Sequence, residues 1–337
     1  MNKEEFNLLY HIFQHQTTKE DLQSVAFSSL TRDGLVSKQG ITEQGLKALD
    51  QYKVDNAIIL AAGYSSRFVP ISYETPKGLL SVKGEILIER QIKQLKEAGI
   101  HNIIIVVGYL KEKFQYLQDK YQVLIIENKE YSSRNNHSSI YAVKEYLGNS
   151  YILCSDNLFT KNVFRSHVYQ PYYAAKYAKG QTEEYCLTLD QDNKITDVSI
   201  GGNNSWYMFG HIFFSKDFSK KYLSFLEEEY NNPRIKQLYW EDIYIEHIES
   251  LDLYVQKYPS EIILEFDSLA DLRLYDKDFL HRTGSKYMEH ISNFLSCDEE
   301  DIVSILPIKE ANHEVHFTFQ VHGQMYEYFK DHILRIS

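Results

Sequence analysis

Residues 56–82, NAIILAAGYSSRFVPISYETPKGLLSV, contain the pattern that decides the fold of this chain. The apolar run at 57–60 does not alternate with polar residues, which is typical of a strand buried on both faces of a parallel sheet. A loop of small residues follows, and its backbone N–H groups can bind phosphate oxygens while Arg67 and Lys77 neutralise their charge. We therefore predict a polyphosphate site formed by these two basic residues together with Leu60, Ala61, Ala62, Gly63, Ser65 and Ser66.

The loop matches neither of the two common nucleotide-binding loops, G-x-x-x-x-G-K-[ST] and G-x-G-x-x-G. Instead, the pattern L-A-A-G-x-x-S-R-x-x-P at 60–70, followed by T-P-K at 75–77, resembles the signature of the sugar-phosphate and choline-phosphate nucleotidyltransferases. The resemblance implies that Arg67 and Lys77 are the catalytic residues. It places Arg67 at the β- and γ-phosphates and Lys77 between the donor and acceptor phosphates.

The composition of the 337-residue chain is that of a globular protein, with 43% hydrophobic residues. Its net charge of −11 argues against a nucleic-acid-binding surface and against an anionic membrane surface. No apolar stretch has the length of a membrane span, and the first residues lack the apolar core of a signal peptide, so we expect a cytoplasmic protein. The 3 cysteines have no CxxC spacing, which indicates neither a disulfide framework nor a zinc site.

Strand and helix patterns alternate from residue 57 onward. Ligands of sheets built in this order bind at the carboxyl ends of the strands, where the small-residue loop lies. The order implies crossover connections, so the predicted fold class is α/β, a doubly wound, mostly parallel sheet with helices on both faces. Strands are predicted at 57–60, 102–107, 123–127, 150–154, 172–177, 184–189, 195–198 and 206–214, and helices at 86–98, 110–120 and 138–147.

The region from about 56 to 276 is similar to the bacterial choline-phosphate cytidylyltransferases, through G-Y-L-K-E at 108–112 and N-N-x-x-S at 135–139. The resemblance implies a Rossmann-like, nucleotide-diphospho-sugar transferase-like domain at 55–280, with an acceptor-binding insertion at about 165–258. It adds Gly108, Tyr109, Asn136 and Ser138 to the nucleotide site; for the last two, capping of a helix is the alternative. It also implies Mg²⁺ held by Asp156, which would contact the nucleotide too, and by Asp267, for which a helix N-cap is the alternative.

The acceptor site is expected to combine aromatic rings with a carboxylate. A quaternary ammonium group donates no strong hydrogen bond, so aromatic faces and negative charge must recognise it. The segment L-Y-W-E-D at 238–242 supplies both kinds of group within five residues. We expect Tyr239, Trp240 and Glu241 to bind the acceptor, together with Tyr185, at a position where the family tends to have Trp.

Two appendages flank the predicted domain. Residues 1–54 are polar and helix-prone, and T-E-x-G-L-x-x-L at 42–49 resembles the wing and last helix of winged helix-turn-helix domains. The segment 23–37 is short for a recognition helix followed by a wing, so we interpret this prefix as degenerate. We expect it to serve docking or homodimer formation, with DNA binding as the alternative. Residues 281–337 predict a helix and a β-hairpin turning at 322–323, which resembles the start of a choline-kinase-like domain without its catalytic loop.

The predicted function is Mg²⁺-dependent transfer of the cytidylyl group of CTP to phosphocholine. Phosphoethanolamine, 2-aminoethylphosphonate or a sugar 1-phosphate is the alternative acceptor, because a primary ammonium would favour carboxylates over rings. A second alternative is a non-catalytic regulator that senses nucleotide and binds DNA through its prefix. The presence of Arg67, Lys77, Asp156 and Asp267 together argues for an enzyme, since a sensor does not need the full set.

Overall fold

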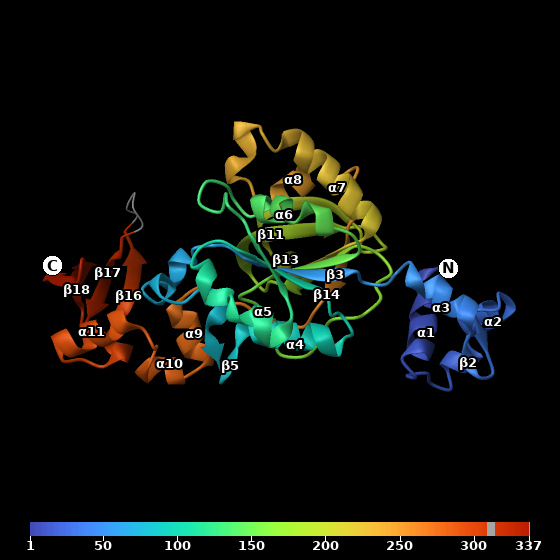
Figure 1. Ribbon diagram of the computed structural model, residues 1–337, viewed down its shortest axis with the longest axis horizontal. Helices are drawn as coiled ribbons and strands as arrows, with labels where there is room; N and C mark the ends of the chain where they lie inside the picture. The colour runs from blue at the N-terminus through green and yellow to red at the C-terminus, as the bar shows by residue number, and fades with distance from the viewer. Residues whose placement is uncertain (309–313, 337) are drawn as a thin grey trace.

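The computed structural model describes residues 1–308 and 314–336. A central α/β body lies between two small units, one at each end of the molecule, and the chain termini are far apart (Figure 1). Among the described residues, no helix has the length and apolar character needed to cross a membrane.

The central sheet is mixed. Its strands from the earlier part of the chain are parallel, and those from the later part are mostly antiparallel. Strands run in the order β12-β11-β13-β8-β3-β6-β7, and β10 joins β13 to β14. The β8-β3-β6-β7 portion is parallel, whereas β13 pairs antiparallel with β8. The strands are β3 (Asn56–Ala61), β6 (Ile103–Val107), β7 (Leu124–Glu127), β8 (Ser150–Cys154), β10 (Tyr172–Tyr177), β11 (Gln181–Leu189), β12 (Ile195–Asn203), β13 (Trp206–Phe214) and β14 (Tyr254–Lys257).

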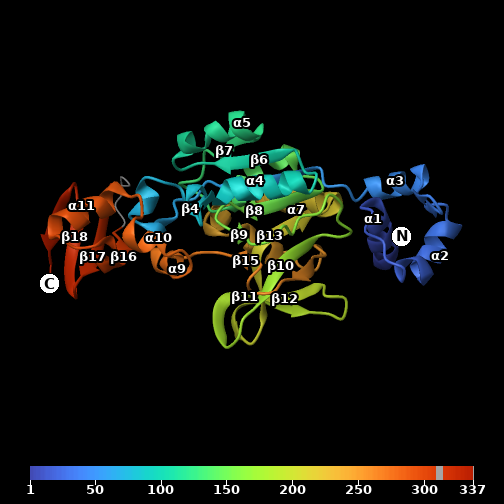
Figure 2. The same cartoon turned by 90° about the horizontal axis from the view of Figure 1, so that it is seen from below.

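Helices cover both faces of this sheet, as the strand and helix order predicts. On β3, Ala57 and Ile59 face one buried apolar cluster, and Ile58 faces a second cluster across the sheet. The first face carries α4 (Leu87–Glu97) and α5 (Tyr116–Tyr121), and the second carries α6 (His137–Ala142), α7 (Lys216–Glu229) and α8 (Trp240–Glu246) (Figure 1). The predicted doubly wound α/β fold is confirmed, and Figure 2 shows that β11 and β12 project from it as a ribbon.

The predicted helix at 110–120 was wrong in detail. A 3-10 turn, η5 (Lys111–Phe114), precedes the short α5, and Leu110 before it has a φ of 50°. Phe114 and Leu117, three residues apart, are both fully buried against the sheet. The tighter 3-10 turn aligns side chains at this spacing, which explains the break. The predicted helix at 138–147 similarly ends at Ala142, before the 3-10 turn η6 (Lys144–Tyr146).

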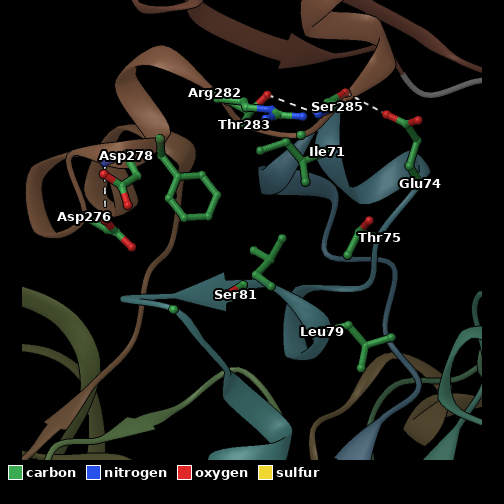
Figure 3. A pocket seen from close by; sticks show the side chains of 14 residues that line it. Ile71, Glu74, Thr75, Leu79, Ser81, Asp276, Asp278, Arg282, Thr283 and Ser285 are labelled. Carbon is green, nitrogen blue, oxygen red and sulfur yellow. Dashed lines mark hydrogen bonds between the residues drawn. The ribbon is translucent and has the colours of Figure 1, made fainter. Parts of the chain in front are cut away.

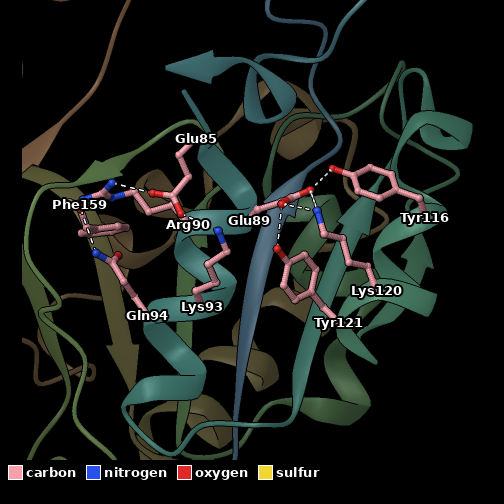
Figure 4. Close-up of polar contacts among 9 residues, drawn as sticks. All are labelled: Glu85, Glu89, Arg90, Lys93, Gln94, Tyr116, Lys120, Tyr121 and Phe159. Atoms are coloured by element: carbon pink, nitrogen blue, oxygen red, sulfur yellow. Dashed lines mark hydrogen bonds and ion pairs between the residues drawn. The ribbon is translucent and has the colours of Figure 1, made fainter. Parts of the chain in front are cut away.

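A buried carboxylate joins α4 to α5 (Figure 4). Glu89 accepts hydrogen bonds from the Tyr116 and Tyr121 hydroxyls at 2.9 and 2.8 Å, and from the Lys120 ammonium at 2.8 Å. Burial would raise the pKa of Glu89, but these donors outweigh it and lower the pKa overall. The resulting stabilisation is present above the carboxyl's unfolded pKa and is lost as pH falls through the lower folded pKa.

Glu89→Gln is expected to lower the free energy of unfolding by about 1–3 kcal/mol, because it weakens charge-assisted hydrogen bonds at a buried acceptor. Denaturant unfolding measures the change. Glu85→Gln, in β5 (Glu85–Ile86) just before this helix, is the matched control: Glu85 pairs with Arg90 and Lys93 of α4 but is more exposed, so the loss should stay below about 1 kcal/mol. Equal losses in the two variants would contradict this assignment.

The N-terminal unit (residues 1–54) contains the helices and hairpin of a small compact domain. Its core includes Phe6, Leu9, Leu30 and Leu49, and the Arg165 guanidinium of the central body stacks 4.3 Å from the centre of the Tyr10 ring. The segment 23–37 holds an eight-residue helix and the two-residue first strand of a hairpin, and the interpretation of the prefix as a degenerate winged helix-turn-helix stays a prediction. The elements are α1 (Lys3–Phe13), η1 (Asp21–Gln23), α2 (Val25–Arg32), β1 (Val36–Ser37), β2 (Gly40–Ile41) and α3 (Glu43–Asp50).

The C-terminal module (residues 281–308 and 314–336) is a helix packed on a four-stranded antiparallel sheet. The predicted hairpin is present, with His322 and Gly323 at its turn. Kinship with the start of a kinase-like domain stays a prediction. The elements are α11 (Lys286–Leu295), η8 (Glu299–Asp301), β16 (Val303–Pro307), β17 (His316–Val321), β18 (Gln324–Phe329) and β19 (His332–Arg335).

The remaining elements are short. They are η2 (Ser66–Phe68), η3 (Ile71–Tyr73), η4 (Lys77–Leu79), β4 (Ser81–Val82), β5 (Glu85–Ile86), β9 (Leu158–Phe159), η7 (Pro233–Gln237), β15 (Ile263–Leu264), α9 (Leu269–Tyr275) and α10 (Asp278–His281). Of these, α9 and α10 lead from the body to this module.

Candidate active site

The loops after β3, β6 and β8 meet at the carboxyl edge of the sheet. The Tyr109 amide donates to the Ala62 carbonyl at 3.2 Å, and the Ser155 amide donates to the Leu60 carbonyl at 3.0 Å. These bonds bring the predicted phosphate loop, the Gly108-Tyr109 loop and the Asp156 loop together. No atom of the described residues lies within 4 Å of the position that a Cβ on Gly63 would take, so the loop is open to a ligand there.

Lys77 is the central cation of this edge. Only 6% of it is exposed, and its ammonium group lies 2.8 Å from an Asp156 carboxylate oxygen and 3.7 Å from one of Glu265. Burial would lower the pKa of Lys77, but the two carboxylates outweigh it and raise the pKa overall. The side chain is therefore a fixed positive charge in a poorly solvated place, which is where a charge stabilises phosphate oxygens most effectively.

Gly78 lets the Lys77 backbone approach the end of β8. A Cβ at this position would lie 2.7 Å from the Cβ and Oγ atoms of Ser155, which is closer than Cβ atoms come to other atoms in real structures. Gly78→Ala is therefore expected to displace the Lys77 turn and to lower kcat by roughly 10²-fold, since small misplacements of this kind are costly. Steady-state kinetics measure the effect. Gly84→Ala is less suitable as a control because its φ is 78°; Ser81→Ala, at an exposed position, should leave kcat unchanged.

Metal binding by Asp267, the second predicted ligand, stays a prediction. Asp267 is half-exposed and pairs with Arg67 at 2.6 Å. Glu265, two residues earlier, is the carboxylate beside Asp156 and Lys77, and it was missed by sequence reasoning. Burial and the neighbouring Asp156 carboxylate raise the pKa of Glu265 to about 7. Its place just after β15, alternating with the buried Phe266, was the available signal.

The donor set fits a cation that is shared with substrate. In the described part of the chain, no three His, Cys, Asp or Glu side chains are grouped so as to hold a metal ion by themselves. Asp156 and Glu265 offer two carboxylates at one place. Mg²⁺ is commonly bound by one or two carboxylates that are completed by phosphate oxygens and water, and these two residues match that pattern.

Aromatic rings border the Gly108-Tyr109 loop. The ring centres of Tyr64 and Tyr109 are 4.9 Å apart, and those of Tyr64 and Tyr131 are 5.4 Å apart. A Cβ on Gly108 would lie 2.6 Å from the Tyr131 ring, so only glycine allows this approach. Burial raises the pKa of Tyr109 to about 12, which keeps its hydroxyl protonated. The phosphate loop is thus continuous with a surface that can stack a base.

Asn136 and Ser138 have structural partners. The Ser138 hydroxyl is buried, donates to the Asn135 carbonyl at 2.7 Å and accepts from the Asn128 amide at 2.8 Å. These contacts support the alternative, a structural role at the start of α6. Asn136 instead faces α8, where its carbonyl oxygen accepts from the Trp240 amide at 2.8 Å and its amide group approaches Glu241 at 3.4 Å. Asn136 therefore contributes to the predicted acceptor site.

Glu241 is the dominant acid of that acceptor site. Its carboxylate accepts from the Tyr173 hydroxyl at 3.0 Å, and burial raises its pKa to about 7. The sheet register relates this acid to the Lys77 cluster: Tyr173 pairs with Ile212 of β13, and Ile212 pairs with Ile152 of β8, the strand that leads to Asp156.

The aromatic residues that were predicted to bind the acceptor differ in where the structure places them. The expectation that Trp240 binds the acceptor was wrong: its ring is 3% exposed and packs 5.7 Å from Tyr173 in the core beneath α8. Tyr239, in contrast, is 47% exposed. Tyr185 donates to the Asp242 carboxylate at 2.9 Å, so it lies on the same side as the acidic pair. Tyr173, which sequence reasoning did not select, replaces Trp240 as the ring beside Glu241.

Comparison with known proteins agrees with this geometry. Residues 57–163 match the family model of the MobA-like NTP transferase domain. The chain is 40% identical over 217 residues to a choline-phosphate cytidylyltransferase of Streptococcus pneumoniae, covering 64% of this chain and 95% of that protein. It is 37% identical to a 2-aminoethylphosphonate cytidylyltransferase of Lancefieldella rimae, covering 67% of this chain and 94% of that one.

A solved structure of CTP:phosphocholine cytidylyltransferase from Streptococcus pneumoniae superposes on 67% of this chain and 99% of its own, with a TM-score of 0.64 and 38% identity. Fold and site together define a nucleotidyltransferase. More narrowly, the chain belongs to the family of bacterial cytidylyltransferases that includes these choline-phosphate and phosphonate enzymes. This membership argues against the alternative of a non-catalytic regulator.

Proposed function

We propose that this protein transfers the cytidylyl group of CTP to phosphocholine, forming CDP-choline and pyrophosphate. The phosphocholine oxygen forms a bond to the α-phosphorus, and the bond from that phosphorus to the oxygen bridging to the β-phosphate breaks. The bridging oxygen leaves with the electron pair as part of pyrophosphate. Because the nucleophile is already an anion, the protein needs to supply mainly position and positive charge.

The observation that carries the nucleotidyl transfer is the placement of Lys77. Its buried ammonium lies 2.8 Å from Asp156 and 3.7 Å from Glu265, at the edge of the sheet where the phosphate loop ends and where donor and acceptor phosphates would meet. From there it can stabilise the charge that develops on the α-phosphate. Arg67, exposed at the rim, can hold the β- and γ-phosphates. Asp156 and Glu265 would hold Mg²⁺, which supplies further charge neutralisation at the phosphates.

The choice of acceptor rests on Glu241 and its surroundings. A carboxylate beside Tyr173 and near the exposed Tyr239 suits a quaternary ammonium, which binds to aromatic faces and negative charge. The adjacent Asp242 favours a second candidate, because a primary ammonium can donate hydrogen bonds to paired carboxylates. The corresponding acceptors are phosphoethanolamine and 2-aminoethylphosphonate, and the similarity to a phosphonate cytidylyltransferase supports keeping them.

Pyrophosphate release with Mg²⁺ tests the proposal directly. CTP, UTP, dTTP, ATP and GTP are each combined with phosphocholine, phosphoethanolamine, 2-aminoethylphosphonate and glucose 1-phosphate. Release confined to CTP with phosphocholine supports the proposed function. Faster release with one of the amine acceptors transfers the assignment to the second candidate, and release only with glucose 1-phosphate would contradict both.

A further inference from the structure

The segment that carries both catalytic cations has its apolar side covered by the C-terminal module. Phe68, Val69 and Leu80, on either side of Lys77, are buried in a single cluster with residues of the module. The contributing module residues are Met288, Ile291, Phe317, Phe319 and Tyr328. Figures 1 and 2 both show this segment lying against the module, at the end of the body away from the N-terminal unit.

Hydrogen bonds fix the same segment on both sides of Lys77. Before it, the Glu74 carboxylate accepts from the Ser285 hydroxyl at 2.7 Å and from the Lys286 amide at 3.0 Å, at the start of α11. The neighbouring Tyr73 hydroxyl donates to the His316 carbonyl at 3.1 Å. Beyond Lys77, the Lys83 amide donates to Asp276 at 2.6 Å.

Figure 3 shows the Glu74–Ser285 contact at the edge of a cavity of about 380 Å³ between the segment and the module. Because the cavity lies between part of the segment and the module, the module supports the segment at its hydrogen-bonded residues and not along its whole length. Lys77 itself pairs with Asp156 of the body. The hydrogen-bonded residues therefore determine where the turn that carries Lys77 lies.

The relatives lack room for an equivalent support. The pneumococcal choline-phosphate cytidylyltransferase aligns over 95% of its length with 217 residues of this chain, and that alignment leaves the module without a counterpart of similar size. The module is therefore an addition relative to that protein. Any function of the module in this chain is therefore additional to the reaction that the relatives are named for.

We propose that the C-terminal module is a positioning element of the active site, and that Glu74 is the positioning residue through which it holds Lys77 in place. The inference rests on the proposed function, because it concerns the same lysine. It assigns to the module a function in turnover that does not depend on any chemistry of its own. Glu74 touches no substrate in this arrangement and acts through the backbone that leads to Lys77.

Kinetics of full-length variants test the proposal. Glu74→Ala should lower kcat roughly 10-fold or more, because the turn that carries Lys77 shifts, while the nucleotide KM changes much less. Glu74→Gln, which keeps an acceptor at the same place, should recover most of the rate. Thr42→Ala is the matched control: it also removes a helix cap, since Thr42 accepts from the Gly45 amide at 3.0 Å, but at the opposite end of the molecule. Its kcat should equal that of the wild type.

The double variant Glu74→Ala/Ser285→Ala distinguishes positioning from general damage. If Glu74 acts through Ser285 and α11, the double variant should resemble Glu74→Ala alone, because contacts in one network are not additive. Full additivity of the two effects, or an unchanged kcat in Glu74→Ala, would overturn the proposal. If the wild type releases no pyrophosphate with any substrate pair, the proposed function fails. Hydrogen exchange then decides the positioning role: faster exchange of the Leu79 and Leu80 amides, which are hydrogen-bonded in the turn that carries Lys77, supports it in Glu74→Ala, and unchanged exchange refutes it.

Discussion

Replacing Lys77 by methionine is expected to lower kcat about 10³-fold and to leave the nucleotide KM within about threefold of its original value. The physical reason is the position of the ammonium group, which is buried beside the carboxylates of Asp156 and Glu265. Its charge becomes most valuable when negative charge builds up on the transferred phosphate. Methionine keeps the length of the apolar stem and removes only the ammonium group, which lies 5.1 Å from the centre of the Phe68 ring. Steady-state pyrophosphate release measures both constants.

Lys93→Met is the matched control for this variant. Lys93 lies on α4, is about half exposed and pairs with Glu85 on the surface. Its removal should change neither constant. If Lys77→Met raised KM and left kcat unchanged, Lys77 would be a ground-state binding residue and its proposed catalytic role would be wrong.

Replacing Glu241 by glutamine is expected to raise the KM for phosphocholine roughly 30-fold or more, because it removes the negative partner of a desolvated cation. The KM for CTP should remain unchanged. Glu246→Gln is the control on the same helix, since Glu246 pairs with Arg234 on the outer surface and should have no effect. An unchanged acceptor KM in Glu241→Gln would remove the carboxylate from the acceptor site.

The raised pKa of Glu241 adds a pH dependence to acceptor binding. With a pKa of about 7, the carboxyl is neutral in acid and becomes an anion as pH rises through 7. Choline has no titrating phosphate, so its inhibition constant isolates this group. Choline should inhibit about tenfold more weakly at pH 6 than at pH 8, and Glu241→Gln should abolish the difference. A flat profile in the wild type would contradict the assignment.

The sequence was most informative where backbone and chemistry are specified by the same residues. The apolar run of β3, the small residues after it and the basic residues at positions 67 and 77 predicted both the sheet and the phosphate site. The loop residues have short side chains, so their positions follow directly from the end of the strand. Asp156 follows β8 in the same manner, and the structure places it against Lys77.

The prediction was weaker where the sequence pattern does not show whether a side chain points into the core or into the site. Trp240, Ile243 and Tyr244 have the helical spacing of a buried face, and all three are in the core, yet the aromatic ring of Trp240 was interpreted as a ligand contact. Glu265 and Asp267 lie two residues apart in an irregular segment, where alternation alone does not decide which acid faces Lys77. Tyr173 is one of 27 tyrosines, and only its strand pairing and its bond to Glu241 identify it.

The ion pairs of the substrate-free site also affect how fast a nucleotide is captured. Arg67 is already neutralised by Asp267 and Lys77 by Asp156, and the whole chain carries a net charge of −11. A triphosphate therefore meets no long-range attraction on its approach, and added salt should not slow its association as it does at sites that steer anions. Capture occurs by exchange at short range, where each phosphate oxygen that reaches a cation releases a carboxylate.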